Sequence, residues 1–397
     1  MKKYLPILFI CFFSLIFLQA QQTVSHNIVH DGLNREYHLY IPKSYDGTIS
    51  VPLLFVFHGY GGSAENLMRW GDMKSVADTA GFIFMVPQGY LDYRGSPHWN
   101  VGSWTAGSTV DDIGFIDKII NKTADDFNID LERVYSYGHS NGGYFSFELA
   151  CQIGNKIAAI GSIGGTMSTE THNSCTPSHP TSVITIHGTS DPVVYYTGGK
   201  PYNSKSQDET IKYWIDFNKT NTSPDILEIE NIDKSDGSHV ELHKYDLGIN
   251  KTSVHHLKII NGGHGWPGRY GNMDIGATTE IWNFVSQFNI NGLINNESTS
   301  LEEEIKSGNK YGITLEQNYP NPFNPSTNIN FYLPQMTQVS LAIYNQLGLK
   351  ITDIIDSEFL RGEQSVVFNL EDLSSGLYFY RLTTPENSIT KTMTLIK

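Results

Sequence analysis

Short apolar, strand-like stretches alternate with helix-like stretches from about residue 23 to residue 288, and this alternation limits the folds that are open to the chain. The strand-like stretches lie at residues 36–41, 51–57, 82–86, 133–137, 157–163, 182–187 and 254–260. Helix-like stretches lie between and after them, at residues 64–80, 113–126, 143–153, 207–218 and 279–288. Such alternation favours a mostly parallel sheet with helices on both faces. The predicted fold class is therefore α/β, over residues 23–289.

The texture of the chain changes after residue 289. Residues 290–312 are polar and have the composition of a linker. Residues 313–397 hold short alternating stretches at 328–333, 339–344, 365–370 and 378–383, which glycine-containing turns separate. This pattern is typical of a small β-sandwich. Residues 313–397 contain neither cysteine nor histidine, so we place no catalytic set there.

The N-terminal residues 1–20 have the features of an export signal. Lys2 and Lys3 precede an apolar run at residues 5–18, and Ala20 is a small residue suited to a cleavage site. The run is shorter than the roughly 20 residues that a spanning helix needs. We therefore predict an exported protein with no stable membrane span after cleavage.

Export bears on the cysteines that remain after cleavage, Cys151 and Cys175. A pair of cysteines in an exported protein predicts a disulfide, which would stabilise the fold by about 3 kcal/mol. The alternative is two buried thiols.

The net charge bears on partners. The chain has 27 Lys and Arg residues against 41 Asp and Glu residues, which gives a formal charge of −14. An acidic surface repels phosphate backbones, so nucleic acid is excluded as an expected partner.

The segment Gly138-His-Ser140-Asn-Gly142 matches the pattern G-x-S-x-G. A strand-like stretch precedes it and a helix-like stretch follows it. This is the setting of a nucleophile elbow, in which a sharp turn exposes the serine hydroxyl and the glycines let strand and helix pass closely. An ordinary glycine-rich turn is the alternative. We predict Ser140 as a nucleophile.

A serine nucleophile needs a base, and the base needs an acid that orients it. In this architecture the chain order is serine, acid, histidine, with each group on a loop after a strand. Asp191 follows the stretch 182–187, and His264 follows the last strand-like stretch on a glycine-rich loop. His187 is a competitor for the base, but it lies upstream of the acid. Asp191 and His264 are therefore the predicted acid and base.

The reaction also needs donors for an oxyanion. The backbone N–H of Asn141, directly after the nucleophile, is one candidate. The loop His58-Gly-Tyr60-Gly-Gly follows an early, strongly apolar strand, and the N–H of Tyr60 is the second candidate. His58 is expected to pack beneath this loop. Asp111 and Asp112 are expected to cap the helix at 113–126.

Several ordered motifs carry a family resemblance over residues 24–288. They are His58-Gly-Tyr-Gly-Gly, Gly138-His-Ser-Asn-Gly-Gly, His187-Gly-Thr-Ser-Asp-Pro and Gly263-His-Gly-Trp-Pro-Gly. The chain resembles the extracellular α/β-hydrolase esterases grouped with polyhydroxybutyrate depolymerases and feruloyl esterases. The resemblance implies the triad Ser140, Asp191 and His264, a disulfide between Cys151 and Cys175, and neither metal nor organic cofactor.

Three tryptophans are candidates for contact with substrate, because aromatic rings stack on aromatic acids and sugars. Trp266 directly follows the loop of the predicted base, and Trp99 and Trp104 lie in a Gly/Ser-rich segment. Packing in the core is the alternative for each of them.

The tail carries a second resemblance. The segment Gln317-Asn-Tyr-Pro-Asn-Pro-Phe-Asn-Pro-Ser-Thr, the later Gly376-Leu-Tyr and the last residues are similar to the C-terminal sorting domain of type IX secretion. This implies the secretion machinery as a partner, and release from the cell or attachment to its outer surface.

Together these observations predict a secreted serine esterase that acts through an acyl-enzyme. The favoured substrate is a hydroxycinnamoyl (feruloyl) or similar ester on plant polysaccharide. A polyhydroxyalkanoate or other polyester is the alternative substrate. The alternative of another class is a non-catalytic surface binding protein on a hydrolase scaffold.

Overall fold

The structure is a computed structural model that describes residues 22–70, 73–105, 107–294, 314–333, 337–345, 349–359, 362–384 and 388–397. The predicted export signal at 1–20 and most of the predicted linker at 290–312 lie outside the described residues. The chain divides into two compact units, Met1–Asn295 and Asn296–Lys397. Within the described ranges no helix has the length and apolar character needed to cross a membrane.

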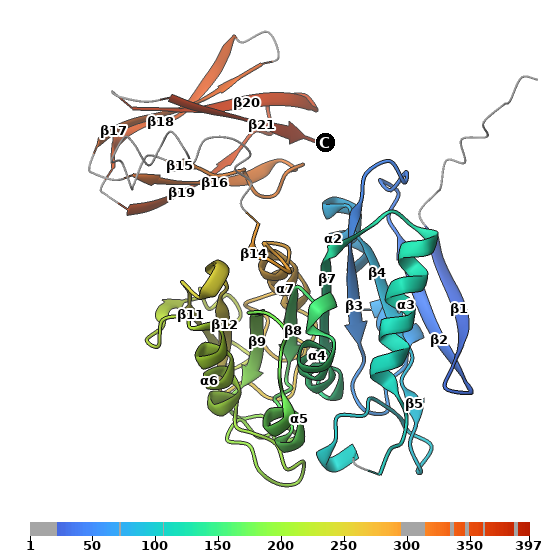
Figure 1. Ribbon diagram of the computed structural model, residues 1–397. Helices are drawn as coiled ribbons and strands as arrows, with labels where there is room; N and C mark the ends of the chain where they lie inside the picture. The colour runs from blue at the N-terminus through green and yellow to red at the C-terminus, as the bar shows by residue number, and fades with distance from the viewer. Residues whose placement is uncertain are drawn as a thin grey trace, which may run out of the picture. The chain divides into compact units, whose positions relative to one another are not determined.

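The first unit is built on one ten-stranded sheet (Figure 1). Its strands are, in spatial order, β1 (Gln22–His30), β2 (Leu33–Ile41), β4 (Ile83–Pro87), β3 (Val51–Phe57), β7 (Ile129–His139), β8 (Ala159–Ile163), β9 (Ser182–Gly188), β12 (Val254–Ile260), β11 (His239–Tyr245) and β10 (Asp225–Glu228). The strands from β4 to β12 in this order run parallel. The strands at both edges pair antiparallel.

Helices cover both faces of this sheet. They are α1 (Ala64–Trp70), α2 (Met73–Ala80), α3 (Asp112–Asp126), α4 (Asn141–Gln152), α5 (Thr169–Ser174), α6 (Gln207–Asn218) and α7 (Ala277–Val285). Successive residues of the apolar strand β3 enter opposite cores. Phe55 packs with residues of α3, α4 and α6, whereas Leu54 packs with residues of α1, α2 and α7. A strand buried on both faces needs a continuous apolar sequence, which residues 51–57 supply.

The order of the strands places one crevice at the centre of the sheet. From β3 the chain moves to β4 on one side, and it then crosses back to β7 on the other side of β3. In open α/β sheets, ligands bind beyond the carboxyl ends of the strands at the point where the order reverses. The loops after β3 and β7 meet at that point.

The predicted α/β fold class, with a mostly parallel sheet and helices on both faces, is confirmed. The region 64–80, predicted as one helix, contains two helices, α1 and α2. Strands β1, β10 and β11 were not predicted, because they lie at or near the sheet edges and carry charged or exposed residues where a core strand would be apolar. Two short hairpins complete the unit: β5 (Tyr90–Leu91) with β6 (Pro97–His98), and β13 (Phe288–Asn289) with β14 (Gly292–Leu293).

The second unit holds two antiparallel sheets around one core. One sheet has the order β15 (Thr314–Leu315), β16 (Ser326–Leu333), β19 (Gly362–Asn369), and the other has the order β18 (Lys350–Phe359), β17 (Thr337–Tyr344), β20 (Gly376–Thr383), β21 (Ser388–Leu395). Ile329, Leu341 and Tyr380 are completely buried between them. The predicted small β domain is confirmed; β18 and β21 were missed, because their sequences are rich in polar residues.

The predicted disulfide joins the C-terminal end of α4 to the residue after α5. Cys151 and Cys175 are bonded, with a Cα–Cα distance of 4.7 Å and a separation of 24 residues. The bond closes a loop that contains β8 and α5, so the prediction is confirmed.

Candidate active site

Ser140 lies at the sharp turn between β7 and α4. Its φ of 53° is in the left-handed region, where residues other than glycine are uncommon. Two backbone hydrogen bonds hold the turn in place. The N–H of Ser140 donates to the carbonyl of Ile163 at 2.8 Å, and the carbonyl of Ser140 accepts from the N–H of Gly143 at 2.8 Å. The strained backbone therefore persists and presents the hydroxyl at the carboxyl end of the sheet.

The glycines beside Ser140 are required by space. A Cβ atom on Gly138 would lie 2.4 Å from the carbonyl carbon of Gly142, and one on Gly142 would lie 2.3 Å from the carbonyl oxygen of Phe57. Strand β7, helix α4 and the end of β3 approach too closely there for any side chain. These close contacts agree with the interpretation of the G-x-S-x-G sequence as a sharp strand–turn–helix connection.

The predicted acid and base are in direct contact. Asp191 follows β9 and His264 follows β12, and the Nδ1 atom of His264 lies 2.7 Å from Oδ2 of Asp191. The other oxygen, Oδ1, accepts the backbone N–H groups of Val193 at 2.8 Å and Val194 at 2.9 Å. Because Asp191 accepts at Nδ1, the second nitrogen of His264 is left to serve as a base.

The carboxyl group of Asp191 is held ionised. Burial raises the pKa of Asp191, but hydrogen bonds from His187 and His264 outweigh burial and hold this pKa below its usual range. A buried carboxylate that stays charged next to the ring stabilises the imidazolium formed during a proton transfer.

Ser140 and His264 line the same cavity. Among the described residues, the side chain of Ser140 has no hydrogen-bond partner, His264 included. Bonds between nucleophile and base are often long before a substrate is bound and tighten in the complex. The structure therefore brings the three predicted residues to one site, with the serine hydroxyl unengaged.

The two predicted oxyanion donors are unengaged as well. Within the described ranges, neither the N–H of Tyr60 nor that of Asn141 has an acceptor. The loop of Tyr60 approaches the nucleophile closely, since a Cβ on Gly59 would lie 3.4 Å from the Cβ of Ser140. Two free N–H groups beside a serine hydroxyl are the arrangement needed for a developing oxyanion.

His58 orients the peptide that carries the N–H of Tyr60. Its Nε2 accepts the backbone N–H of Gly89 at 3.0 Å, so its Nδ1 carries the proton and donates to the carbonyl of Gly59 at 2.7 Å. The Gly59 carbonyl and the Tyr60 N–H belong to one planar peptide group and point in opposite directions. Burial lowers the pKa of His58 to about 4, so the ring stays neutral.

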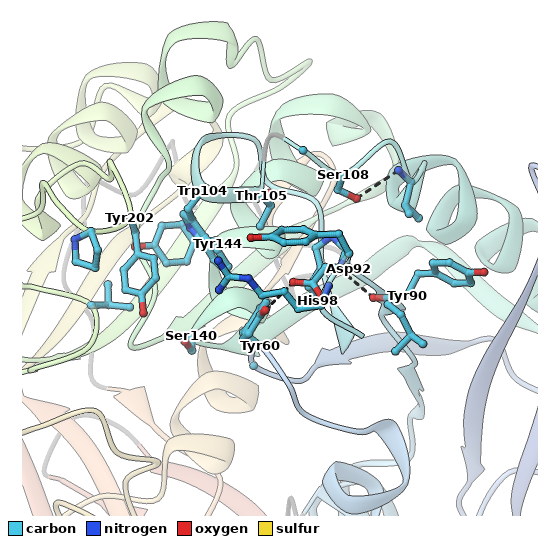
Figure 2. Close-up of a pocket in the computed structure, with 18 of the residues that line it drawn as sticks. Tyr60, Tyr90, Asp92, His98, Trp104, Thr105, Ser108, Ser140, Tyr144 and Tyr202 are labelled. Atoms are coloured by element: carbon cyan, nitrogen blue, oxygen red, sulfur yellow. Dashed lines mark hydrogen bonds between the residues drawn. The ribbon is translucent and has the colours of Figure 1, made fainter. Parts of the chain in front are cut away.

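A cavity of about 990 Å³ opens beside Ser140. Aromatic side chains from separate segments surround it, and Figure 2 shows Tyr60, Trp104, Tyr144 and Tyr202 around Ser140. The ring of Trp104 lies edge-on to Tyr202, with centroids 5.1 Å apart, and to Tyr60, at 5.8 Å. The hydroxyl of Tyr60 donates to Asp92 at 2.6 Å, which fixes this ring at the cavity edge (Figure 2).

The three predicted substrate-binding tryptophans have different positions. Trp104 lines the cavity. Trp99 is completely buried in the core, so the prediction that it contacts substrate is wrong. Its indole N–H donates to the carbonyl of His58 at 3.0 Å, and the side chain of Asn141 bonds its backbone N–H and carbonyl. Trp99 thus supports the loop of the oxyanion donors.

Trp266 is also buried, with 1% of its surface exposed, and lies against Tyr137 and His139. It does not line the large cavity. It borders a smaller one, of about 290 Å³, which residues of the loop 58–62 also line. Its predicted contact with substrate stays a prediction for that smaller cavity alone.

Asp111 caps helix α3 as expected, since its carboxylate accepts the N–H of Gly114 at 2.8 Å. Asp112 does more. It is buried, pairs with Arg35 of β2 at 2.6 Å, and accepts the backbone N–H of Asn100 at 2.8 Å. Asp112 therefore anchors the loop that carries Trp99 and Trp104, a role that the sequence pattern did not indicate.

The sequence missed most of the cavity wall. Tyr144 and Tyr202 were not predicted, and neither was the side chain of Tyr60. No signal marks them, because an aromatic residue in a core and one in a cavity wall have the same local pattern. In the described part of the chain, no group of three or more His, Cys, Asp or Glu side chains is arranged to hold a metal ion.

Comparison with known proteins gives two findings. Residues 317–397 match the family model described as a secretion system C-terminal sorting domain. The predicted sorting domain is thus confirmed, and it indicates secretion or a place at the outer cell surface.

The rest of the chain is similar to esterases. A bifunctional acetylxylan esterase/xylanase of Neocallimastix patriciarum is 25% identical over 309 residues, covering 78% of this chain and 39% of that protein. A probable feruloyl esterase C of Aspergillus niger is 30% identical over 179 residues, covering 44% of this chain and 61% of that protein. The chain thus spans about two fifths to three fifths of the length of these relatives. A solved acetyl xylan esterase from Aspergillus awamori superposes with a TM-score of 0.47 at 15% identity, covering 66% of this chain and 99% of that structure.

Proposed function

We propose that this relative of the feruloyl and acetylxylan esterases is a secreted serine hydrolase that cleaves carboxylic esters through an acyl-enzyme. One observation carries the proposal. Ser140 has a strained backbone and, among the described residues, a hydroxyl without a partner, and it lines the same cavity as His264. The Nδ1 atom of His264 is held by the buried carboxylate of Asp191. Two backbone N–H groups that are free within the described ranges lie beside Ser140. This combination makes a neutral alcohol into a nucleophile and stabilises the charge that its attack creates.

The first half of the reaction forms the acyl-enzyme. Nε2 of His264 takes the hydroxyl proton of Ser140 as Oγ bonds to the ester carbonyl carbon. The carbonyl oxygen becomes an oxyanion, which accepts the N–H groups of Tyr60 and Asn141. His264 then gives its proton to the alcohol oxygen as the C–O bond breaks, and the alcohol leaves.

The second half repeats these steps with water. His264 takes a proton from water, and the hydroxide oxygen bonds to the acyl carbon. The same two N–H groups hold the oxyanion. The bond to Ser140 Oγ then breaks as His264 returns the proton, which releases the acid and restores the enzyme.

For the substrate we favour a hydroxycinnamoyl or similar aromatic acyl group esterified to plant polysaccharide. The support is the wall of the large cavity, where Trp104 and several tyrosines offer ring faces and edges. The names of the relatives point to the same class of ester.

Two measurements test the proposal. Ser140→Ala should abolish turnover of p-nitrophenyl acetate, by about 10⁴-fold or more, while the protein stays folded. Unchanged turnover would overturn the assignment of the nucleophile to Ser140, whereas no turnover by the unsubstituted chain would favour a binding protein on a hydrolase scaffold. Release from methyl ferulate, acetylxylan and polyhydroxybutyrate film should then be compared. Clearing of the film with no release of ferulate would replace the favoured substrate with a polyester.

A further inference from the structure

His187 makes a second side-chain contact to the catalytic carboxylate. Its Nε2 lies 3.3 Å from Oδ2 of Asp191, the same oxygen that faces His264, and 2.9 Å from the carbonyl oxygen of Val194. The side chain of His187 is completely buried. The proposed catalytic cycle does not use His187. Because its ring is completely buried, both ring nitrogens need hydrogen-bond partners within the protein.

The contacts of His187 fix its tautomer. A carbonyl oxygen only accepts, so the contact to Val194 requires that Nε2 carries the proton. In a neutral ring the other nitrogen, Nδ1, is then an acceptor. It lies 3.0 Å from the side-chain amide of Gln207, the first residue of α6.

The amide of Gln207 completes the argument. As placed, its oxygen faces Nδ1 of His187, and its nitrogen is buried without a hydrogen-bond partner. The two ends of an amide are nearly the same shape, so a half-turn is free of steric cost. After the half-turn the NH₂ group donates to Nδ1, and the clash between two acceptors disappears. Gln207 is completely buried, so a mismatched amide there is costly.

We infer that Gln207 and His187 form a positioning pair. Gln207 holds His187 in the tautomer with the proton on Nε2, and His187 donates that proton to Asp191 and so sets how strongly Asp191 attracts the imidazolium of His264. With His187 and His264 on Oδ2 and the amides of Val193 and Val194 on Oδ1, the carboxylate has four donors. Neither member touches substrate, so both act through Asp191.

Other titratable groups also face this pair. His256 of β12 and His139 of β7 lie near enough to act electrostatically on it, and the ring of Tyr196 is 5.6 Å from that of His187. Burial lowers the pKa of His139 to about 3 and holds the pKa of His256 well below its usual value. Both rings therefore stay neutral at working pH, and the charge that faces His187 is that of Asp191.

The pair predicts opposite shifts in two variants of the full chain. His187→Phe removes the donor, so Asp191 attracts the imidazolium of His264 more strongly. Gln207→Glu places a carboxylate on Nδ1, which draws a second proton onto His187, and the new cation beside Asp191 weakens this attraction. The acid limb of the kcat/KM profile for p-nitrophenyl acetate should move up by about half to one pH unit in the first variant and down in the second.

Thr210→Val is the matched control. Thr210 is buried in the same helix, and its hydroxyl accepts the N–H of Met167 at 3.2 Å without touching His187. This variant should lose stability, but the acid limb of its kcat/KM profile should stay at the pH found for the unsubstituted chain. The inference would be overturned if the acid limb lies at the same pH in all folded variants, or if it shifts in the same direction in His187→Phe and Gln207→Glu.

The kinetic test rests on the proposed function, so a second measurement is independent of it. NMR of the imidazole nitrogens in the unsubstituted full chain reports the tautomer of His187 directly. The neutral ring is expected to carry its proton on Nε2, with Nδ1 unprotonated, at about pH 8. A proton on Nδ1 would overturn the inference of a positioning pair, even if the protein is an active esterase. If the protein has the expected tautomer but no activity, only the proposed function would be overturned.

Discussion

At the scale of single residues, the site depends on groups that never meet the substrate. In the proposed mechanism the N–H of Asn141 is one of the two oxyanion donors, while its side chain bonds the backbone N–H and carbonyl of Trp99. Trp99 in turn holds the carbonyl of His58, and His58 holds the Gly59–Tyr60 peptide. The two oxyanion donors are therefore linked through one buried chain of hydrogen bonds. A change in this chain is expected to act on the transition state more than on the bound ground state.

His58→Leu tests this link. Loss of the bond to the Gly59 carbonyl lets the Gly59–Tyr60 peptide turn, which misdirects the N–H of Tyr60. Because removal of one oxyanion donor costs about 10²–10³-fold in kcat, kcat for p-nitrophenyl acetate should fall by about 10²-fold with KM little changed. His58→Asn is the matched variant, since its amide can still donate to the carbonyl, and it should recover part of kcat. A rise in KM with unchanged kcat, or equal activity in the two variants, would contradict this role for His58.

At the scale of elements, the parts that could be predicted are those with a local signature. The strand–turn–helix around Ser140 has its glycines, and the acid and base follow strands in the expected order. The cavity wall lacks such a signature. Trp99 and Trp104 are five positions apart in one loop, yet one is core and the other lines the cavity. That difference is set by tertiary anchors such as Asp112, whose partner Arg35 lies in a distant strand.

The Arg35–Asp112 pair is expected to be the main anchor between β2, α3 and the loop at 97–112. Asp112→Asn leaves a buried guanidinium without a counter-charge, and it should lower the free energy of unfolding by about 3–5 kcal/mol. The measurement is urea unfolding of the full chain. Asp111→Asn, at the neighbouring exposed cap, should cost less than about 1 kcal/mol, because asparagine caps a helix about as well as aspartate. The double variant Arg35→Met with Asp112→Leu should be more stable than Asp112→Asn, because it buries no unpaired charge; if it is less stable, the pair is not the cause.

At the scale of the whole molecule, catalysis and sorting are separate in the chain. All the residues of the proposed chemistry lie in the first unit, and the match to a sorting domain begins at residue 317. The first unit also holds histidines that burial keeps neutral. Burial lowers the pKa of His58 to about 4 and that of His139 to about 3, and it holds the pKa of His256 well below its usual value.

These histidines predict how stability depends on pH. In the unfolded chain they titrate near pH 6.5, whereas in the folded protein they stay neutral down to about pH 4. Between these limits the unfolded state binds more protons, so the free energy of unfolding falls as pH falls, by up to about 1.4 kcal/mol per pH unit for each histidine. Asp191 changes the free energy of unfolding only below this pH window, because its contribution to stability is fully present above the ordinary carboxylate pKa. Urea unfolding at about pH 7 and about pH 5 measures how much the free energy of unfolding changes with pH. His139→Asn should reduce this slope by the contribution of one histidine. A slope that this variant leaves unchanged would mean that His139 is not neutral in the folded protein.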